Sequence, residues 1–248
     1  MGKVLIAMSG GVDSSVAAYL LKHSGWDCVG ATMTLYRNED IGISRSRTCC
    51  SLEDVEDARS VAFRLRIPYY VFNFSDEFRR QVMDRFADAY GQGRTPNPCI
   101  DCNRYLKFRH LYDRAALLGC DAIATGHYAR IERENGRYLL KKALDASKDQ
   151  SYVLYMLTQE QLAHTQFPLG ALHKAETRQL ADSLGFFNAR KPDSQDICFV
   201  PDGDYAAFIR RHTGKADTPG DFVDESGRTL GCHKGIAHYT IGQRKGLG

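Results

Sequence analysis

The segment Leu5–Leu21, LIAMSGGVDSSVAAYLL, places two adjacent glycines and four small polar residues between an apolar run and an amphipathic one. Residues 3–9 are predicted to form a buried strand, and the apolar positions in 13–23 follow helical spacing. A glycine-rich turn from a strand into a helix can offer several backbone N–H groups to an anion, and the helix dipole adds to the attraction. The pattern therefore predicts a phosphate-binding loop at residues 9–14.

Two common phosphate motifs do not match this loop. No Gly-Lys-Ser/Thr follows the glycines, so the segment is not a Walker P-loop, and adjacent glycines do not fit the G-x-G-x-x-G dinucleotide pattern. The carboxylate of Asp13 would suit Mg²⁺, a hard ion that prefers carboxylate and phosphate oxygens. The alternative interpretation is a tight turn in which Asp13 caps the helix.

Composition places the chain among ordinary globular proteins, with 43% hydrophobic and 25% charged residues. It contains no run of eighteen apolar residues and no readable secretory signal, which predicts a cytoplasmic protein with no membrane partner. A formal net charge of +3 is compatible with an RNA partner without requiring one. Eight cysteines without a signal peptide argue against a secreted disulfide scaffold, so some are expected to be buried and others reactive or ligating.

Strand and helix patterns alternate through the first 130 residues, which predicts an α/β fold with a doubly wound, mostly parallel sheet. Ligands of such sheets bind beyond the carboxyl ends of the strands. Asn135 followed by Gly136 is a hairpin signal. Further strands are expected at 28–36, 69–74 and 121–132, and helices at 51–67, 76–90, 104–118 and through much of 151–185. After Phe199 the segments indicate a second, β-containing unit, so we predict domains at 1–205 and 206–248.

The loop Ser9-Gly10-Gly11-Val12-Asp13-Ser14 resembles the SGGxDS loop of the PP-loop ATP pyrophosphatases, and other segments narrow the resemblance. Signature segments of the tRNA-specific 2-thiouridylases are similar to GRTPNPCIDCN (Gly93–Asn103), ATGHYAR (Ala124–Arg130), DSQDICFV (Asp193–Val200), CCSLEDVEDAR (Cys49–Arg59), KDQSYVLY (Lys148–Tyr155) and the terminal YTIGQRKGLG. The resemblance covers the whole chain in order and spacing. It implies a PP-loop, Rossmann-like fold and sulfuration of C2 of the wobble uridine in tRNA, with ATP converted to AMP and diphosphate.

The resemblance also implies roles for individual residues. The expected ATP site consists of Ala7, Met8, Ser9, Gly10, Gly11, Val12, Asp13, Ser14, Met33 and Gly126. The residues expected to meet the target base are Asn97, Pro98 and Cys99, and those expected to contact tRNA elsewhere are His127, Lys148, Asp149 and Gln150. Cys102 and Cys198 match the catalytic pair, in which Cys198 carries a persulfide and Cys102 assists sulfur release and can form a disulfide with it. Asp13 joins them as the expected Mg²⁺ ligand.

Cys99 departs from the family pattern, because many members have aspartate at this position. Together with Cys102 and the distant Cys198 it supplies three thiolates, which can hold a [4Fe-4S] cluster with one iron open to carry sulfide. Zinc would instead occupy the nucleophiles in closed tetrahedral coordination. Two sulfur carriers therefore stay open, a persulfide on Cys198 and a cluster on the three cysteines, supplied by a sulfur donor protein or inorganic sulfide.

The family resemblance further implies a C-terminal β-barrel that this chain would lack, so residues 206–248 are expected to be the truncated start of a central tRNA-binding domain. Two other functions remain alternatives. One is another PP-loop adenylating enzyme of the amidotransferase type, which full turnover after Cys198→Ser would favour. The other is a non-catalytic RNA-binding module, which tRNA-dependent formation of AMP and diphosphate would exclude.

Overall fold

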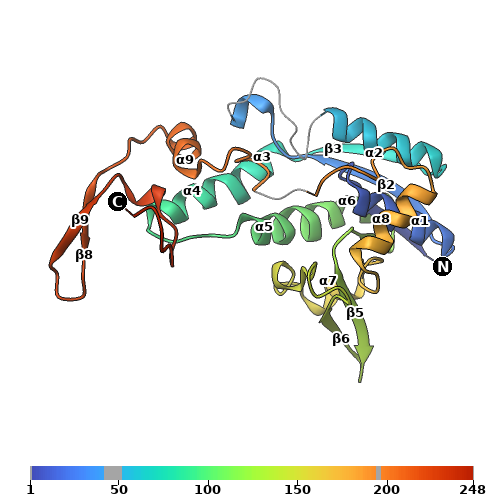
Figure 1. Ribbon diagram of the computed structural model, residues 1–248. Coiled ribbons are helices and arrows are strands. Elements are labelled where there is room, and N and C mark those ends of the chain that lie inside the picture. The colour runs from blue at the N-terminus through green and yellow to red at the C-terminus, as the bar shows by residue number, and fades with distance from the viewer. Residues whose placement is uncertain (1, 42–51, 194–196, 248) are drawn as a thin grey trace.

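The computed structural model describes residues 2–41, 52–193 and 197–247, and a five-stranded parallel sheet lies at its centre (Figure 1). The strands, in spatial order, are β3 (Tyr69–Asn73), β2 (Asp27–Thr34), β1 (Lys3–Ala7), β4 (Ala122–Ala124) and β7 (Thr165–Gln166). Strands β2 and β3 lie on one side of β1, and strands β4 and β7 lie on its other side. The sheet is therefore doubly wound, as predicted, and its switch point lies between β1 and β4, where such sheets bind ligands.

Helices cover both faces of the sheet because successive side chains of a strand point to opposite sides. Val4 and Ile6 of β1 pack on the face covered by α1 (Val12–His23), α2 (Leu52–Arg64) and α8 (Lys174–Ser183). Leu5 packs on the opposite face. That face is covered by α3 (Ser75–Phe78), η2 (Arg79–Met83), α4 (Asp84–Gly91), η3 (Cys102–His110) and α6 (Leu111–Leu117).

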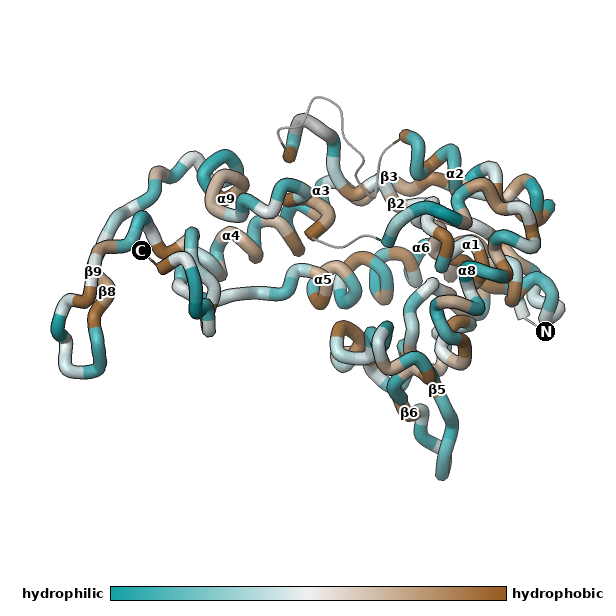
Figure 2. Tube along the Cα trace, viewed as in Figure 1, coloured by the Kyte–Doolittle hydropathy of each residue, from teal (hydrophilic) through white to brown (hydrophobic). Residues whose placement is uncertain are grey.

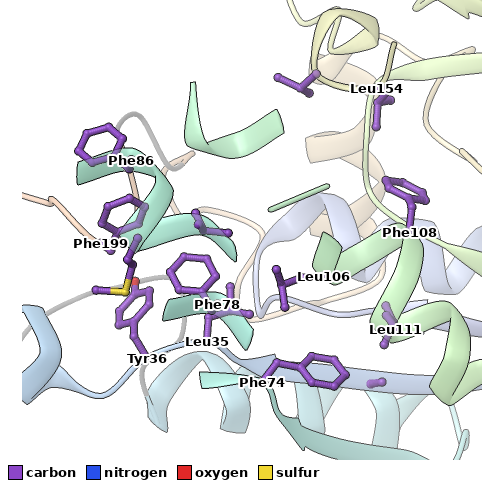
Figure 3. Close-up of a cluster of buried hydrophobic side chains, with 14 of the residues drawn as sticks. Leu35, Tyr36, Phe74, Phe78, Phe86, Leu106, Phe108, Leu111, Leu154 and Phe199 are labelled. Atoms are coloured by element: carbon purple, nitrogen blue, oxygen red, sulfur yellow. The ribbon is translucent and has the colours of Figure 1, made fainter. Parts of the chain in front are cut away.

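An aromatic cluster extends the core of this second face away from the sheet (Figure 3). The Phe199 ring lies 5.6 Å from Phe78, 5.4 Å from Phe86 and 5.0 Å from Phe208, measured between ring centroids. Burial of each ring contributes about 1.5–3 kcal/mol. Phe208 belongs to α9 (Tyr205–Thr213), so the helix that begins at the predicted domain boundary packs into the core of the preceding residues.

Two antiparallel hairpins project from the main body (Figure 1). The first pairs β5 (Ala129–Glu134) with β6 (Arg137–Lys142), and its tip is hydrophilic (Figure 2). Asn135 and Gly136 both have positive φ, 49° and 79°, which confirms the hairpin signal. The second pairs β8 (Gly220–Val223) with β9 (Thr229–His233). The remaining elements are η1 (Asn38–Ile41), α5 (Pro98–Asp101), η4 (Ser151–Val153), α7 (Gln159–Ala163) and η5 (Ile236–His238).

Two expected elements differ from the structure. The single strand predicted over 121–132 is wrong: the chain leaves the sheet after Ala124 and re-enters strand conformation at Ala129 in the hairpin. The region 151–185 is less helical than expected, since Thr165 pairs with Ile123 and adds an edge strand. Short apolar runs are compatible with both a helix and a strand, so pairing with distant segments decides which one forms. Among the described residues, no helix is long and apolar enough to cross a membrane.

Candidate functional site

The glycine-rich loop after β1 has a shape that requires its glycines. Gly10 has a φ of +74°, and a Cβ placed there would lie 2.4 Å from the backbone oxygen of Asp54. Gly126, in the turn after β4, would bring a Cβ to 2.8 Å from the backbone nitrogen of Ser14. The two loops that follow β1 and β4 are thus in contact at Gly126, and the expected place of Gly126 beside a nucleotide stays a prediction.

Side chains tie the carbonyl groups of this loop back toward the protein. The Ser14 hydroxyl donates to the oxygen of Gly11 at 3.1 Å and accepts from the Ser9 N–H at 3.2 Å. Asn188 donates from Nδ2 to the oxygen of Gly10 and to the Ser15 hydroxyl, each at 2.9 Å. Because the oxygens are held in this way, the N–H groups at the start of α1 remain the groups that an anion meets.

Asp13 does not cap α1, which excludes the alternative interpretation of the loop as a simple capped turn. The N-cap residue is Gly11, and no side chain caps the N-terminus of α1 by a hydrogen bond. Both Asp13 oxygens instead accept from the Lys174 ammonium at 2.7 Å, and Oδ1 also accepts from the Tyr128 hydroxyl at 3.0 Å. A lysine from α8 therefore lies at the phosphate loop, although the loop sequence itself contains none.

Asp193 lies at the centre of a cluster of cations beside this loop. Its carboxylate lies 2.8 Å from Lys174 Nζ, 2.7 Å from Arg178 Nη2 and 3.0 Å from Lys148 Nζ. Partial burial acts to raise the pKa of Asp193, but hydrogen bonds from Lys174 and Lys148 outweigh it and lower that pKa to about 2. Three cations and the two carboxylates of Asp13 and Asp193 leave a net positive charge, which favours an incoming anion.

The depressed pKa of Asp193 predicts an acid dependence of stability. A carboxyl group in the unfolded chain has a pKa of about 3.9, so folding favours the charged form. Its stabilisation is complete above about pH 4 and is lost as the pH falls toward 2. We expect Asp193→Asn to lower the free energy of unfolding at pH 7 and to converge on the wild type near pH 2, measured by urea denaturation across this range. Parallel wild-type and variant curves between pH 4 and 2 would contradict this assignment.

The geometry of Gly10 predicts a specific effect of a single methyl group. Gly10→Ala adds both a strained positive φ, about 1–2 kcal/mol, and a collision with the Asp54 backbone. Gly136→Ala is the matched control, because Gly136 has a φ of +79° with nothing within 4 Å of the added Cβ. In the control, we expect the free energy of unfolding to fall only by the cost of the strained φ. In Gly10→Ala it should fall further, and the loop should lose the shape expected to bind phosphate. Equal unfolding free energies for the two variants would count against the contact.

The turn after β4 holds His127 in a buried position. Burial, and secondly the nearby Lys107 ammonium, keep the pKa of His127 well below its usual range, so the ring is neutral at pH 7. Lys107 Nζ lies 3.5 Å from Nε2, and Thr125 Oγ1 lies 2.7 Å from Nδ1. Since an ammonium can only donate, Nε2 accepts and Nδ1 carries the proton toward Thr125. His127 is 7% exposed, and Lys107 is the more accessible member of the pair.

The other three residues predicted to contact tRNA make bonds within the protein. Lys148 pairs with Asp193, and Asp149 accepts from the Ala143 N–H at 2.8 Å and the Ser151 hydroxyl at 2.7 Å. Gln150 exchanges two hydrogen bonds with the backbone of Tyr128, 2.9 and 3.0 Å long. The two bonds of Gln150 attach the segment 148–151 to the turn after β4. All three side chains therefore stabilise the local fold.

Cys99 and Cys102 lie on the first turns of a helix that begins earlier than expected. The expected helix start at residue 104 is wrong, because the Asn97 side chain accepts from the Cys99 N–H at 3.0 Å and Pro98 supplies the first helical residue. Helical structure then continues from α5 through η3 into α6. Cys99 is exposed, whereas Cys102 is half-buried against the core. Burial raises the pKa of Cys102 to about 11, although Lys107 acts to lower it, so a thiol predominates at pH 7.

Cys198 lies five residues after Asp193, and a hydrogen bond to its backbone fixes its position. Its carbonyl oxygen accepts from the Tyr36 hydroxyl at 2.6 Å, and the neighbouring Phe199 ring is part of the aromatic cluster (Figure 3). The Cys198 side chain is half-buried on the same core as Cys102. Cys28 and Cys120 are buried in the core, as expected of inert thiols. Cys49, Cys50 and residues 194–196 lie outside the described residues.

The three cysteines proposed as cluster ligands do not form a ready metal site. Across residues 2–41, 52–193 and 197–247, no group of three or more His, Cys, Asp or Glu side chains is placed to hold a metal ion. Cys99 and Cys102 are one helical turn apart, and Cys198 lies on a separate segment. The donor set of the structure therefore does not fit a [4Fe-4S] cluster as it stands.

Comparison with known proteins places this arrangement in a family. The family described as "tRNA methyl transferase HUP domain" matches residues 2–202, and "tRNA methyl transferase PRC-barrel domain" matches residues 206–248. The chain is 56% identical over 250 residues to tRNA-specific 2-thiouridylase MnmA of Lachnoclostridium phytofermentans, covering 100% of this chain and 70% of that protein. The chain belongs to the tRNA-specific 2-thiouridylase family. The MnmA protein of Clostridioides difficile is 54% identical over 248 residues, covering 99% and 68% of the two chains.

A solved structure supports the fold of this 2-thiouridylase family member. The chain resembles a 4-thiouridine synthetase, solved as an RNA complex with bound ATP, with a TM-score of 0.55 and 22% identity. The match covers 81% of this chain and 45% of the other. At this level of identity the likeness shows a shared fold.

Sequence reasoning missed several residues that contact the glycine-rich loop. Lys174 was visible only as part of the helix KAETRQLADSLG, and it meets Asp13 across 161 positions of sequence. Asn188 and Tyr128 reach the glycine-rich loop from similarly distant segments. No local sequence motif predicts contacts between residues so far apart in the chain. Met33 lies at the carboxyl end of β2, where it pairs with Phe72 of β3, and its expected role at the nucleotide stays a prediction.

Proposed function

We propose that this chain is an ATP-dependent tRNA 2-thiouridylase, which adenylates O2 of the wobble uridine and transfers sulfur to C2. One observation carries the proposal: a single segment, residues 148–154, joins the glycine-rich loop to the cysteine helix. Gln150 is bonded to Tyr128, whose hydroxyl reaches Asp13. Three residues later, the Val153 oxygen accepts from Asn103 Nδ2 at 3.2 Å, next to Cys102. A chain of hydrogen bonds thus links the glycine-rich loop to the helix that carries Cys102.

ATP is proposed to bind at the switch point of the sheet. Residues Ala7–Ser14 would surround the phosphates, with Met33 and Gly126 beside the nucleotide. Lys174 would supply the positive charge that a Walker lysine gives elsewhere, moving from Asp13 and Asp193 toward phosphate oxygens. Asp13, once released by Lys174, has the carboxylate oxygens that Mg²⁺ prefers, and the ion would neutralise charge on the phosphates.

The first chemical step activates a poor electrophile. Uridine O2 attacks the α-phosphorus of ATP, an O–P bond forms, and diphosphate leaves. The uridine oxygen then belongs to a good leaving group, AMP. The positive cluster of Lys148, Lys174 and Arg178 favours the step, because preorganised cations stabilise the charge that develops on the departing diphosphate.

The second step transfers sulfur, and we propose the persulfide route for it. A sulfane-sulfur donor first converts Cys198 to a persulfide, whose terminal sulfur attacks C2 as AMP departs with the former O2. The Cys102 thiolate then attacks the Sγ atom of Cys198, which releases 2-thiouridine and leaves a Cys102–Cys198 disulfide. A thiol reductant restores both cysteines. The raised pKa of Cys102 means that a proton must leave this thiol before the last attack.

A [4Fe-4S] cluster is the alternative sulfur carrier for the same reaction. It requires Cys99, Cys102 and Cys198 to gather around one site, which calls for rearrangement from the described positions. Iron and acid-labile sulfide content of anaerobically purified protein, compared with Cys99→Ser, separates the two routes. An iron-free wild type that thiolates tRNA supports the persulfide, whereas about four irons per chain, lost in the variant, would overturn it in favour of the cluster.

The function is tested by incubating the chain with unmodified tRNA, MgATP and a sulfane-sulfur donor. We expect 2-thiouridine in digested tRNA by mass spectrometry, with one AMP and one diphosphate formed for each sulfur inserted. Omitting ATP or tRNA should abolish all three products. Formation of AMP and diphosphate with ammonia, but never with sulfur, would instead indicate an amidotransferase-type reaction, and absence of nucleotide turnover would indicate a binding module.

A further inference from the structure

The segment that follows Gln150 exposes two tyrosines, at positions 152 and 155. Tyr152 is 61% exposed and Tyr155 is 65% exposed, while the two residues between them, Val153 and Leu154, are buried. Leu154 packs in the same core as Phe108 (Figure 3). The buried pair therefore fixes the backbone, and the two aromatic rings face solvent from a rigid base.

Backbone hydrogen bonds hold the segment between the two tyrosines. Val153 N–H donates to the Gln150 oxygen, and Leu154 N–H donates to the Ser151 oxygen, so successive bonds span three residues. The short 3₁₀ helix η4 carries Tyr152, and Tyr155 follows in the turn after it. Large exposed aromatic rings on a backbone fixed in this way are suited to binding a flat partner.

The position of the pair relates it to the proposed chemistry. Asn103, the residue after Cys102, holds the Val153 oxygen between the two tyrosines. Arg104 lies close enough to Tyr155 for its charge to interact with the phenol, and its guanidinium lies 5.9 Å from the Tyr105 ring centroid. Aromatic rings next to an arginine, two positions after Cys102, form a mixed aromatic and cationic surface.

We propose that Tyr152 and Tyr155 form a stacking platform for unpaired bases of RNA that flank the target uridine, with Arg104 contacting the phosphate backbone. The inference rests on the proposed function and deepens it, because it names how the unpaired substrate strand is held. Single-stranded RNA exposes base faces that a duplex hides, and aromatic side chains recognise them by stacking. The neighbouring Lys148, Asp149 and Gln150 are engaged within the protein, so the tyrosines are the exposed groups this segment offers.

The test measures RNA affinity of Tyr152→Ala, Tyr155→Ala and the conservative Tyr152→Phe and Tyr155→Phe. The probe is a fluorescent anticodon stem-loop RNA with uridine at the wobble position, and the readout is Kd by anisotropy. Each alanine variant is expected to weaken binding about 10-fold, whereas each phenylalanine variant, which keeps the ring, stays within about 2-fold of wild type. Phe63→Ala, which removes an 84% exposed ring on α2, is the matched control and should not change Kd.

Salt dependence separates stacking from charge. The slope of log Kd against log salt should be unchanged in the tyrosine variants and should fall by about 0.7 in Arg104→Gln, because that variant loses one phosphate contact. Unchanged Kd in both alanine variants, with wild-type thiolation intact, would overturn the platform and leave the proposed function standing. Normal RNA affinity with loss of sulfur delivery would overturn it in favour of a protein partner. No RNA binding or thiolation by the wild type would overturn the proposed function itself.

Discussion

Replacing Cys198 by serine should abolish sulfur transfer and leave the nucleotide site intact. The Cys198 side chain would carry the transferred sulfur, and a serine hydroxyl cannot form a persulfide. We expect at least a 1,000-fold fall in 2-thiouridine formation, consistent with the loss of a covalent nucleophile (of the order of 10³ or more). The measurement is a single-turnover assay of thiolated tRNA by mass spectrometry, together with ATP affinity by calorimetry.

Cys232→Ser provides the matched control for Cys198. Cys232 is an exposed cysteine of β9, bonded to Asp221, and lies on the β8–β9 hairpin (Figure 1). Its replacement should leave both readouts at the wild-type level. Because Cys198 is fixed by its backbone carbonyl bond to Tyr36, the serine variant should also keep the wild-type unfolding free energy. Thiolation at the wild-type rate by Cys198→Ser would remove the persulfide route.

Replacing Lys174 by methionine should cause the second large loss, in the nucleotide half of the reaction. Lys174 is 8% exposed and bridges Asp13 and Asp193. Methionine therefore leaves Asp13 without its cation beside a second carboxylate, while Asp193 keeps Lys148 and Arg178. We expect about 100-fold slower formation of AMP, by analogy with removal of one preorganised stabilising group. Stability should fall by about 2 kcal/mol, less than for a fully buried pair because both carboxylates retain water.

Two further variants separate the catalytic effect of Lys174 from its structural effect. In Lys174→Met/Asp193→Asn the two carboxylates no longer repel each other, so part of the lost unfolding free energy should return while AMP formation stays slow. Lys141→Met is the control, since Lys141 also bridges two carboxylates, Glu132 and Glu134, but lies on the β5–β6 hairpin. Recovery of AMP formation together with stability in the double variant would show that Lys174 acts only in the fold.

Local sequence patterns predicted the parts of the fold that depend on short-range physics. The strand before Ser9, the helix after Gly11 and the Asn135–Gly136 hairpin all form where periodicity and turn chemistry placed them. The start of the cysteine helix was missed, although Asn97 followed by Pro98 is a cap signal that was available in the sequence. The breaker residues around it outweighed this signal.

Pairing between distant segments decided what local patterns could not. The edge strand at Thr165 exists because β4 offers an unpaired side, and the break after Ala124 exists because Gly126 packs against the loop of Ser14. Hydrogen bonds and packing across more than a hundred residues leave no periodic trace in the chain.

The sequence by itself determined membership of a family whose motifs occur in order, and it predicted a glycine-rich loop for phosphate and a pair of cysteines for sulfur. Only the tertiary structure decided which charges lie beside that loop. It brought Lys174 to Asp13, clustered three cations on Asp193, and buried His127 while exposing Tyr152. The reason is physical, since electrostatic and stacking interactions act over a few ångströms of space regardless of separation along the chain.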